Sequence, residues 1–374
     1  MEIEEYNLIE ERNQKKLSNK VIESFSPIHF EKSGYPIRIK DYEELGRYID
    51  VMQENRYLSN LKILGYSSDE DEKLIKKISN DINKFARNFN IFSFGKNILT
   101  RSLISKRIHD LFLNKGDSVL EIGPGSGYYA SICYENQIKY YGIEITQALY
   151  LYQSNFYFNT YRNDYANYAK KIENKKINHI PWWIWANENL EFKINIITAN
   201  HVLCEMHPNS LLFTFKKAIN LFQNSNEKII ICEGAGSRRF SSPEHVVYLM
   251  NKIGWRLVHT VNNIYIFIHT TSSHEFKNKM SFRRKINFKY LRYLVRHETK
   301  NIFSILSYLL KFIFKKDCYY HNLEIRSLNN FDFSKPNISP KKIKNIDNID
   351  NIFSAKNDDD TTKDEKFLNY ININ

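Results

Sequence analysis

The stretch that most constrains the fold runs from residue 118 to residue 146, where two short apolar segments enclose a glycine-rich turn and a helical segment. Residues 119–122 and 138–143 have the pattern of buried strands, and residues 128–135 between them can form a helix. Three glycines follow the first strand at once: Gly123, Gly125 and Gly127. Glycine permits a sharp turn and a close approach of ligand to backbone, and the first N–H groups of a helix are unpaired. This order of elements predicts a nucleotide-binding unit in an α/β fold.

Two acidic residues flank the unit. Glu121 lies in the first strand just before the glycines, and Glu144 stands at the end of the second strand. A carboxylate at Glu144 can accept hydrogen bonds from two ribose hydroxyls. The glycines follow a Gly-x-Gly-x-Gly spacing, whereas a dinucleotide site needs Gly-x-Gly-x-x-Gly around a pyrophosphate. An acid at Glu121 suits an ammonium group better than a pyrophosphate, so an NAD site and a ligand-free turn are the disfavoured alternatives.

Residues 120–127, Leu-Glu-Ile-Gly-Pro-Gly-Ser-Gly, resemble motif I of the class I S-adenosylmethionine-dependent methyltransferases. The resemblance implies a Rossmann-like, seven-stranded α/β sheet with S-adenosyl-L-methionine as cofactor. It also implies that the methionine end of the cofactor lies against four residues of the turn: Glu121, Gly123, Gly125 and Gly127. The ribose would then bind Glu144. Thr146 starts the next helix beside this acid, as a cofactor contact or as a helix N-cap.

Length and composition divide the chain into four segments. We expect residues 1–97 to form an N-terminal helical lead-in, which is either a lid over the acceptor or a packing extension. The resemblance implies that residues 98–272 form the S-adenosylmethionine-binding methyltransferase domain. Residues 273–328 form a basic amphipathic helical extension, and residues 329–374, rich in Asn, Asp and Lys, have the composition of a disordered tail.

Apolar periodicity predicts further elements. Helices are expected before the glycine turn at residues 40–56, 69–89 and 98–113. Strands are expected after it at residues 177–184, 194–199 and 227–232, followed by a hairpin at 255–269. Three tryptophans stand near the end of the first of these strands: Trp182, Trp183 and Trp185. They either stack on the adenine or pack in the core.

A polar stretch from Asn200 to His207 follows the strand expected at 194–199. Ligands of open α/β sheets lie beyond the carboxyl ends of the strands. An Asn followed five residues later by Glu-Met at this place is similar to a motif of sugar O-methyltransferases, and the matching residues are Asn200, Glu205 and Met206. The resemblance implies a sugar acceptor from surface polysaccharide biosynthesis. We count Asn200 among the cofactor contacts.

Methyl transfer from a sulfonium is an in-line displacement, and a sugar hydroxyl needs a base that removes its proton as it attacks. Three residues of the stretch are candidates: His201, Glu205 and His207. We favour His201 as base, with Glu205 orienting it or the acceptor, since the two share a face if the stretch forms one helical turn. The same residues can instead hold a divalent metal, but magnesium prefers carboxylate oxygens and only one is present. We therefore predict no metal; His207 can also act as a helix cap.

The chain carries a net charge of +12, and most of it comes from residues 274–316, where twelve basic residues face two acidic ones. The apolar run within this segment is too short to span a bilayer. A basic, aromatic segment of this kind either lies on an anionic membrane surface, through residues 283–316, or packs on the catalytic domain. A nucleic-acid partner is disfavoured because no recognition motif accompanies the charge.

The four cysteines, Cys133, Cys204, Cys232 and Cys318, form no Cys-x-x-Cys pair, so neither a disulfide framework nor a zinc site is indicated. The acidic N-terminus lacks the apolar core of a secretory signal. Both features favour a cytoplasmic protein, at the inner face of the membrane if the basic extension binds lipid.

Three acceptor forms fit these features: a free sugar, a nucleotide-sugar and a glycolipid. Arg238 and Arg239 can bind a phosphate of a nucleotide-linked or lipid-linked acceptor. Two other functions stay open, an RNA or protein methyltransferase and a non-catalytic cofactor-binding or membrane-docking subunit. The first is disfavoured as a base methylase, because Asn200 is followed by His201 and Val202 rather than by Pro-Pro-Tyr.

Overall fold

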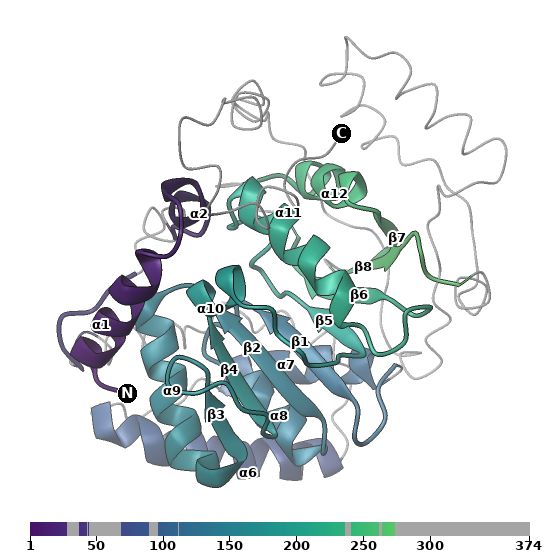
Figure 1. Cartoon of the computed structure of the whole chain (residues 1–374). Coiled ribbons are helices and arrows are strands. Elements are labelled where there is room, and N and C mark those ends of the chain that lie inside the picture. Colours follow the sequence, from purple (N-terminus) through teal and green to yellow (C-terminus); the bar gives the residue numbers. More distant parts are fainter. Residues whose placement is uncertain are drawn as a thin grey trace, which may run out of the picture. The chain divides into compact units, whose positions relative to one another are not determined.

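The computed structural model has an α/β, Rossmann-like fold (Figure 1). It describes residues 1–27, 37–42, 44, 69–89, 96–110, 112–235, 241–261 and 264–273. The chain divides into two compact units, with Ala199 in the first and Asn200 in the second. We describe each unit by itself.

The first unit contains five parallel strands in the order β3-β4-β2-β1-β5. Their bounds are β1 Ser118–Ile122, β2 Lys139–Glu144, β3 Tyr165–Asn167, β4 Ile177–Pro181 and β5 Ile196–Thr198. The register places Glu121 of β1 opposite Gly142 on β2 and Thr198 on β5. Since parallel strands end at one edge of a sheet, the glycine turn after β1 and Glu144 at the end of β2 lie at the same edge.

Two features of this sheet differ from expectation. The strand expected at 177–184 ends at Pro181, because residues 182–187 form the helix α10 (Trp182–Asn187). The structure also adds β3, which pairs in parallel with the start of β4. With the three strands of the second unit the described chain has eight strands, one more than the seven expected. A three-residue strand is too short to show an apolar period in the sequence.

Helices α8 (Tyr128–Glu135) and α9 (Gln147–Tyr161) follow β1 and β2, as the sequence predicts. Helix α6 (Asp69–Ala86) packs with α7 (Lys96–His109), α8 and α9. The ring of Phe85 on α6 lies 5.4 Å from that of Tyr152 and 5.5 Å from that of Phe156, both on α9. The apolar stripe that predicted α6 is therefore a packing surface within this unit. Short 3-10 turns follow α6 and α9, as η2 (Arg87–Phe89) and η3 (Arg162–Asp164).

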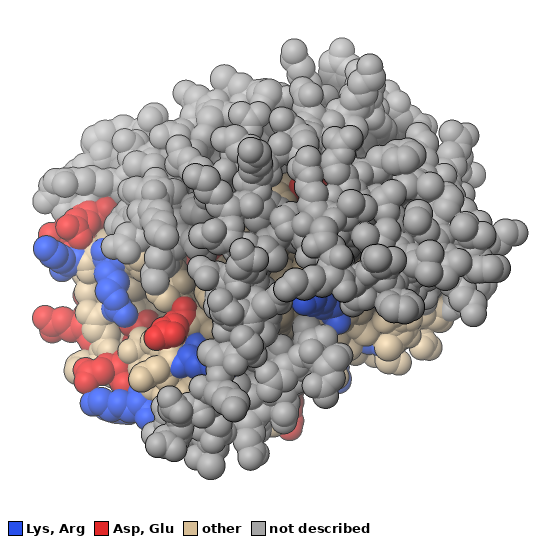
Figure 2. All heavy atoms as spheres, turned by 90° about the horizontal axis from the view of Figure 1, so that it is seen from above, with Lys and Arg blue, Asp and Glu red and all other residues tan. Residues whose placement is uncertain are grey.

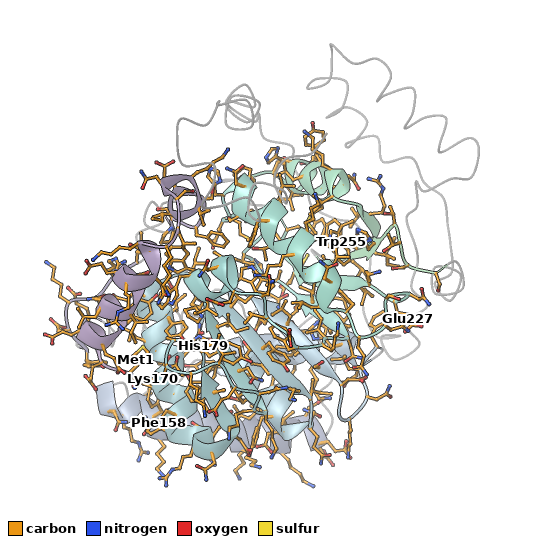
Figure 3. The ribbon with its side chains drawn as sticks, viewed as in Figure 1. Met1, Phe158, Lys170, His179, Glu227 and Trp255 are labelled. Atoms are coloured by element: carbon orange, nitrogen blue, oxygen red, sulfur yellow. The ribbon has the colours of Figure 1, made fainter. Side chains whose placement is uncertain are left out.

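Helices α1 (Ile3–Gln14) and α2 (Asn19–Ser24) lie in the helical lead-in expected at residues 1–97, where the sequence indicated no bounds for them. Tyr6 on α1 is fully buried, and its ring packs edge-on against Trp183 at 5.0 Å. Glu10, also buried, accepts a hydrogen bond from Nε1 of Trp182 at 2.9 Å and pairs with Arg38. At the start of α1, the Met1 amine donates to Asn155, and Lys170 pairs with Glu5 at 2.8 Å; Figure 3 labels Met1 and Lys170.

The second unit contains three antiparallel strands in the order β6-β8-β7, together with helices α11 (Pro208–Lys217), η4 (Ala218–Leu221) and α12 (Pro243–Lys252). The predicted hairpin is confirmed: β7 (Trp255–Val261) pairs with β8 (Ile264–His269), and β8 pairs with β6 (Ile229–Glu233). Trp255, labelled in Figure 3, is fully buried, and its indole N–H donates to the carbonyl of Phe215 at 3.1 Å. This bond joins the start of β7 to α11.

Several predicted features lie outside the described residues, namely most of the helix expected at 40–56, Arg238 and Arg239, Cys318, and the segments 274–328 and 329–374. Within the described part of the chain no helix is long and apolar enough to cross a membrane. In the same part, no group of three or more His, Cys, Asp or Glu is placed to hold a metal ion. On the face seen in Figure 2, the described acidic and basic side chains lie interspersed.

Candidate functional site

The glycine turn adopts a backbone that favours glycine at three places. Gly123, Gly125 and Gly127 have φ angles of 65°, 63° and 76°, in the left-handed region. The amide of Gly123 donates to the carbonyl of Ile143 at 2.9 Å, which joins the turn to the end of β2. Gly127 is the N-cap of α8, and a Cβ atom there would overlap the hydroxyl of Tyr157. The predicted turn therefore exists, and its third glycine is needed for both conformation and space.

Helix α9 holds the turn from one side through two carbonyl groups. Nε2 of Gln153 donates to the carbonyl of Gly125 at 2.6 Å, and the hydroxyl of Tyr157 donates to the carbonyl of Gly127 at 2.9 Å. Both side chains are fully buried. The two bonds fix the direction of the peptide units in the turn.

Glu144 is 2 % exposed, and its carboxylate accepts four hydrogen bonds from the part of the chain that the structure describes. Its Oε1 accepts from the amide of Ile145 at 2.8 Å, and from the amide and hydroxyl of Thr146 at 3.0 and 3.1 Å. Its Oε2 accepts from Nε2 of Gln153 at 3.2 Å. Burial raises the pKa of Glu144, and these bonds oppose the rise. The carboxylate predicted to bind ribose is thus held in one orientation.

Thr146 occupies the N-cap position of α9 as predicted, but its side chain makes no capping bond. The hydroxyl donates to Glu144 instead. The amide of Ala148 in the first turn donates to the carbonyl of Ile37 at 3.2 Å, and the amide of Ile39 donates to Oε1 of Gln147 at 2.8 Å. The carbonyl of Ile37 therefore caps the first turn of α9, and the hydroxyl of Thr146 binds Glu144.

Glu121 is 3 % exposed, and its Oε2 accepts a hydrogen bond from the hydroxyl of Tyr140 at 2.6 Å. Tyr140 reaches it by lying over Gly142, where a Cβ would stand only 2.7 Å from the Tyr140 hydroxyl oxygen. Burial raises the pKa of Glu121 to about 8; the Tyr140 bond opposes the rise, and the charge of Glu144 adds to it. Among the described residues, one hydrogen bond to Glu121 is seen, whereas Glu144 accepts four.

The first unit thus brings two buried carboxylates, Glu121 and Glu144, together at the glycine turn. Among the described residues, no Lys or Arg forms an ion pair with either of them. Buried carboxylates without a cation are costly, so the site favours a ligand that brings positive charge. A ligand with an ammonium or sulfonium group and ribose hydroxyls fits this donor and acceptor set.

The three tryptophans near the end of β4 pack in the core. Trp182, Trp183 and Trp185 are each 4 % exposed or less. The ring of Trp182 stacks on Phe25 at 5.7 Å, and that of Trp183 packs on Tyr6. Of the two alternatives drawn from the sequence, the structure favours core packing over stacking on adenine.

In the second unit, Asn200 and His201 are joined to the end of β6. Oδ1 of Asn200 accepts from the amide of Glu233 at 2.9 Å, and the amide of His201 donates to the carbonyl of Glu233 at 2.6 Å. His201 has a φ of 58°, which is uncommon for a residue with a side chain. Its Nε2 lies 3.4 Å from Oε1 of Glu233, while the side chain as a whole is 41 % exposed.

The ring of His201 lies against Gly234, where a Cβ would overlap Nδ1 and Cε1 of the imidazole. Gly234 has a φ of 70° and continues the chain directly after Glu233. The histidine is therefore held between a carboxylate and a glycine. Such backbone strain at a polar residue is often found at functional sites.

The other two catalytic candidates have different surroundings. His207 is the N-cap of α11, and its Nδ1 accepts from the amide of Asn209 at 3.1 Å, so the capping alternative is the one that the structure shows. Glu205 lies in a turn in which its amide donates to the carbonyl of Val202 at 2.8 Å. The premise that 201 and 205 share a helical face is wrong, because the left-handed His201 interrupts helical geometry.

Four residues of these two clusters were missed from the sequence: Tyr140, Gln153, Tyr157 and Glu233. Glu233 had a detectable signal, since an acid at the end of a strand followed by glycine repeats the pattern seen around β1. The other three lie in the interiors of apolar elements, where nothing in the sequence distinguishes them from core residues.

Comparison with known proteins assigns the domain. Residues 98–232 match a family model described as "Methyltransferase domain". No curated protein matches the chain.

Solved structures with a similar fold include three methyltransferases. A TehB-like S-adenosylmethionine-dependent methyltransferase from Corynebacterium glutamicum is 12 % identical, with a TM-score of 0.34 over 52 % of this chain and 99 % of that one. An S-adenosylmethionine-dependent methyltransferase from Aquifex aeolicus is 14 % identical, with a TM-score of 0.31 over 59 % of this chain and 96 % of that one. Magnesium protoporphyrin IX methyltransferase from Synechocystis, with bound S-adenosylmethionine, is 11 % identical, with a TM-score of 0.31 over 61 % and 96 %.

We base the assignment on the family match together with the geometry of the turn and its two acids. Glu121, Glu144 and the glycine turn all lie within the matched residues and fit a cationic cofactor that carries ribose. Residues 98–232 therefore form a class I S-adenosylmethionine-dependent methyltransferase domain.

Proposed function

We propose that this chain transfers the methyl group of S-adenosylmethionine to a hydroxyl oxygen of a sugar in a surface glycan or its precursor. The sugar class is supported by the resemblance of Asn200, Glu205 and Met206 to the motif of sugar O-methyltransferases. A hydroxyl acceptor is supported by one observation, the contact between His201 and Glu233 on the stretch that follows β5 in the chain.

When bound, S-adenosylmethionine supplies an electrophilic methyl group on a sulfonium. A sugar hydroxyl stays protonated near neutral pH, so a base must take its proton as the oxygen attacks. An imidazole has a pKa suited to this task, and a neighbouring carboxylate holds it in one tautomer.

In this proposal Nδ1 of His201 is the base. Nε2 is buried 3.4 Å from Oε1 of Glu233 and makes no hydrogen bond among the described residues. A small rotation of the ring would let Nε2 donate to this carboxylate, which would keep the proton of the neutral ring on Nε2. Nδ1 then carries the lone pair that accepts the proton of the acceptor hydroxyl. As the ring becomes an imidazolium, the carboxylate of Glu233 stabilises its charge.

Two further residues have roles in this proposal. The side chain of Asn200 fixes the end of β6 through the amide of Glu233, so it holds the acid that orients His201. Glu205 is half-buried in the next turn and provides the acceptor contact. His207 keeps the start of α11 in place.

The proposal is tested by product formation from S-adenosylmethionine with a panel of nucleotide-sugars, free sugars and glycolipids, using the whole purified chain. S-adenosylhomocysteine is measured together with the mass of the methylated acceptor. His201→Gln should lower kcat by about 10²- to 10⁴-fold, which is the usual contribution of a general base. The Kd for S-adenosylhomocysteine should stay at the wild-type value.

His245→Gln is the matched control, because His245 lies on α12 in the same unit and is not part of the His201–Glu233 pair. Its kcat should equal that of the wild type. Equal kcat values for His201→Gln and wild type would show that His201 is not the base. Methyl transfer to RNA or protein, with none to any sugar, would refute the acceptor class.

A further inference from the structure

We propose that Gln153 is a positioning residue of the cofactor site, whose carboxamide sets the glycine turn and the carboxylate of Glu144 in a fixed relation to each other. The inference rests on the ribose-binding role of Glu144 within the methyltransferase domain. It does not depend on which acceptor is methylated.

Gln153 is fully buried on α9 and lies between the two parts of the site. A carboxamide nitrogen carries two hydrogens, so it can donate two bonds at once. Here Nε2 donates to the carbonyl of Gly125 at 2.6 Å and to Oε2 of Glu144 at 3.2 Å. One side-chain atom therefore contacts both the turn and the acid.

The orientation of this carboxamide is determined by its surroundings. Turning it over would place its oxygen against the carbonyl oxygen of Gly125 and the carboxylate of Glu144, which are both acceptors. In the orientation observed, Oε1 of Gln153 is buried and has no hydrogen-bond partner among the described residues. A buried carbonyl oxygen without a partner is unfavourable. Because the two donated bonds outweigh this cost, they are the feature that keeps the amide in place.

Gln153 belongs to a polar stripe on α9 that repeats every four residues. The hydroxyl of Tyr157 donates to the carbonyl of Gly127 at 2.9 Å, and the hydroxyl of Tyr161 donates to Oγ of Ser131 at 2.6 Å. Residues four apart lie on one face of a helix. The stripe holds the turn and α8, and Gln153 is the member that also contacts Glu144.

The consequence concerns the direction of the Glu144 carboxylate. Three donors from residues 145 and 146 fix Oε1, and Gln153 fixes Oε2, so the plane of the carboxylate is set. Without the Gln153 bond, Oε2 can rotate and the acid no longer presents both oxygens in a constant direction. Recognition of the ribose hydroxyls should then weaken more than other cofactor contacts.

The test compares two ligands, S-adenosylhomocysteine and its 2′-deoxyribose analogue, by calorimetric titration of the whole chain. Gln153→Met keeps the volume of the side chain and removes its donors. Hydrogen bonds to charged groups contribute enough that we expect a loss of about tenfold or more in affinity for S-adenosylhomocysteine. The ratio of the two Kd values, which reports the ribose contact, should fall toward one in this variant.

Gln147→Met is the matched control. Gln147 is a second buried glutamine on α9, and its carboxamide bonds to Asn7 and to the amide of Ile39 rather than to the glycine turn. This variant should keep the wild-type ratio of the two Kd values even if its Tm falls. A purely structural role for Gln153 would change the ratio no more than Gln147→Met does, and that result would overturn the proposal.

Gln153→Glu provides a second variant of the same shape if the methionine variant does not fold. It replaces the two donated bonds with an acceptor opposite two acceptors, so S-adenosylhomocysteine binding should be lost at pH 8. Wild-type affinity in this variant would overturn the proposal. A wild-type chain that binds neither ligand would overturn the cofactor site itself, whereas binding without sugar methylation would refute only the proposed acceptor.

Discussion

The buried carboxyl of Glu121 should make the ligand-free protein less stable as the pH rises. Burial raises the pKa of Glu121 to about 8 from its ordinary value of 4.5. The native protein therefore holds a proton that the unfolded chain releases between these two values. The contribution of this carboxyl to stability is fully present below pH 4.5 and is lost as the pH rises to about 8.

The size of the effect follows from the shift. One pKa unit corresponds to about 1.4 kcal/mol, so a pKa raised from 4.5 to about 8 gives a loss of about 5 kcal/mol in unfolding free energy between pH 4.5 and 8. Glu121→Gln has no proton to release at this position. Relative to this variant, the unfolding free energy of the wild type should fall by up to about 1.4 kcal/mol for each pH unit between pH 4.5 and 8.

Urea unfolding of both proteins at pH 5.5, 6.5, 7.5 and 8.5 measures this difference. Tryptophan fluorescence follows the first unit well, because it contains Trp182, Trp183 and Trp185 of the chain's four tryptophans. We expect Glu121→Gln to gain stability over the wild type with increasing pH, while it binds S-adenosylhomocysteine more weakly. A constant difference in unfolding free energy from pH 5.5 to 8.5 would refute the inference that Glu121 is protonated in the ligand-free state.

Three further variants test other contacts in the first unit. Gly127→Ala places a side chain at a left-handed φ and makes its Cβ overlap the Tyr157 hydroxyl, so it should cost about 1–3 kcal/mol of unfolding free energy. It should also abolish measurable binding of S-adenosylhomocysteine, and a calorimetric titration equal to that of the wild type would contradict this. Tyr140→Phe removes the hydroxyl that donates to the carboxylate of Glu121, and calorimetry should show about tenfold weaker cofactor binding, whereas equal Kd values would show that this bond does not matter for the cofactor. Trp182→Phe removes one hydrogen-bond donor to the buried Glu10, so thermal unfolding should show a Tm lower by several degrees while cofactor affinity stays at the wild-type value. A wild-type Tm would contradict the inference that this bond from Trp182 to α1 stabilises the fold.

Local patterns were sufficient to predict the glycine turn and its neighbours. The helix at 128–135 has the predicted bounds, β1 begins one residue before the expected strand, and β2 is shifted by one residue at both ends. Short-range rules explain this success. A buried parallel strand needs a run of apolar residues, and the left-handed turn needs glycine regardless of what packs around it.

Contacts that are distant in sequence could not be predicted in this way. Helix α1 is rich in charged residues, so its sequence does not indicate which face is buried. The structure shows that face through Glu10, which accepts a hydrogen bond from Trp182 and pairs with Arg38. In the same way, the sequence favours Glu205 as the residue that orients His201 or the acceptor, since the two would share a face in one helical turn, but the carboxylate that faces His201 is Glu233.

The α/β class, the glycine turn and the two acids at the edge of the sheet can be predicted from the amino-acid sequence, because they depend on residue type and on spacing within one βαβ unit. The partners that surround those acids become visible only in the folded chain. Gln153 reaches Glu144 from α9, Tyr140 reaches Glu121 across Gly142, and Glu233 reaches His201 from the end of β6. The physical reason is that a hydrogen bond depends on the position and direction of two groups in space, and packing of whole elements sets both.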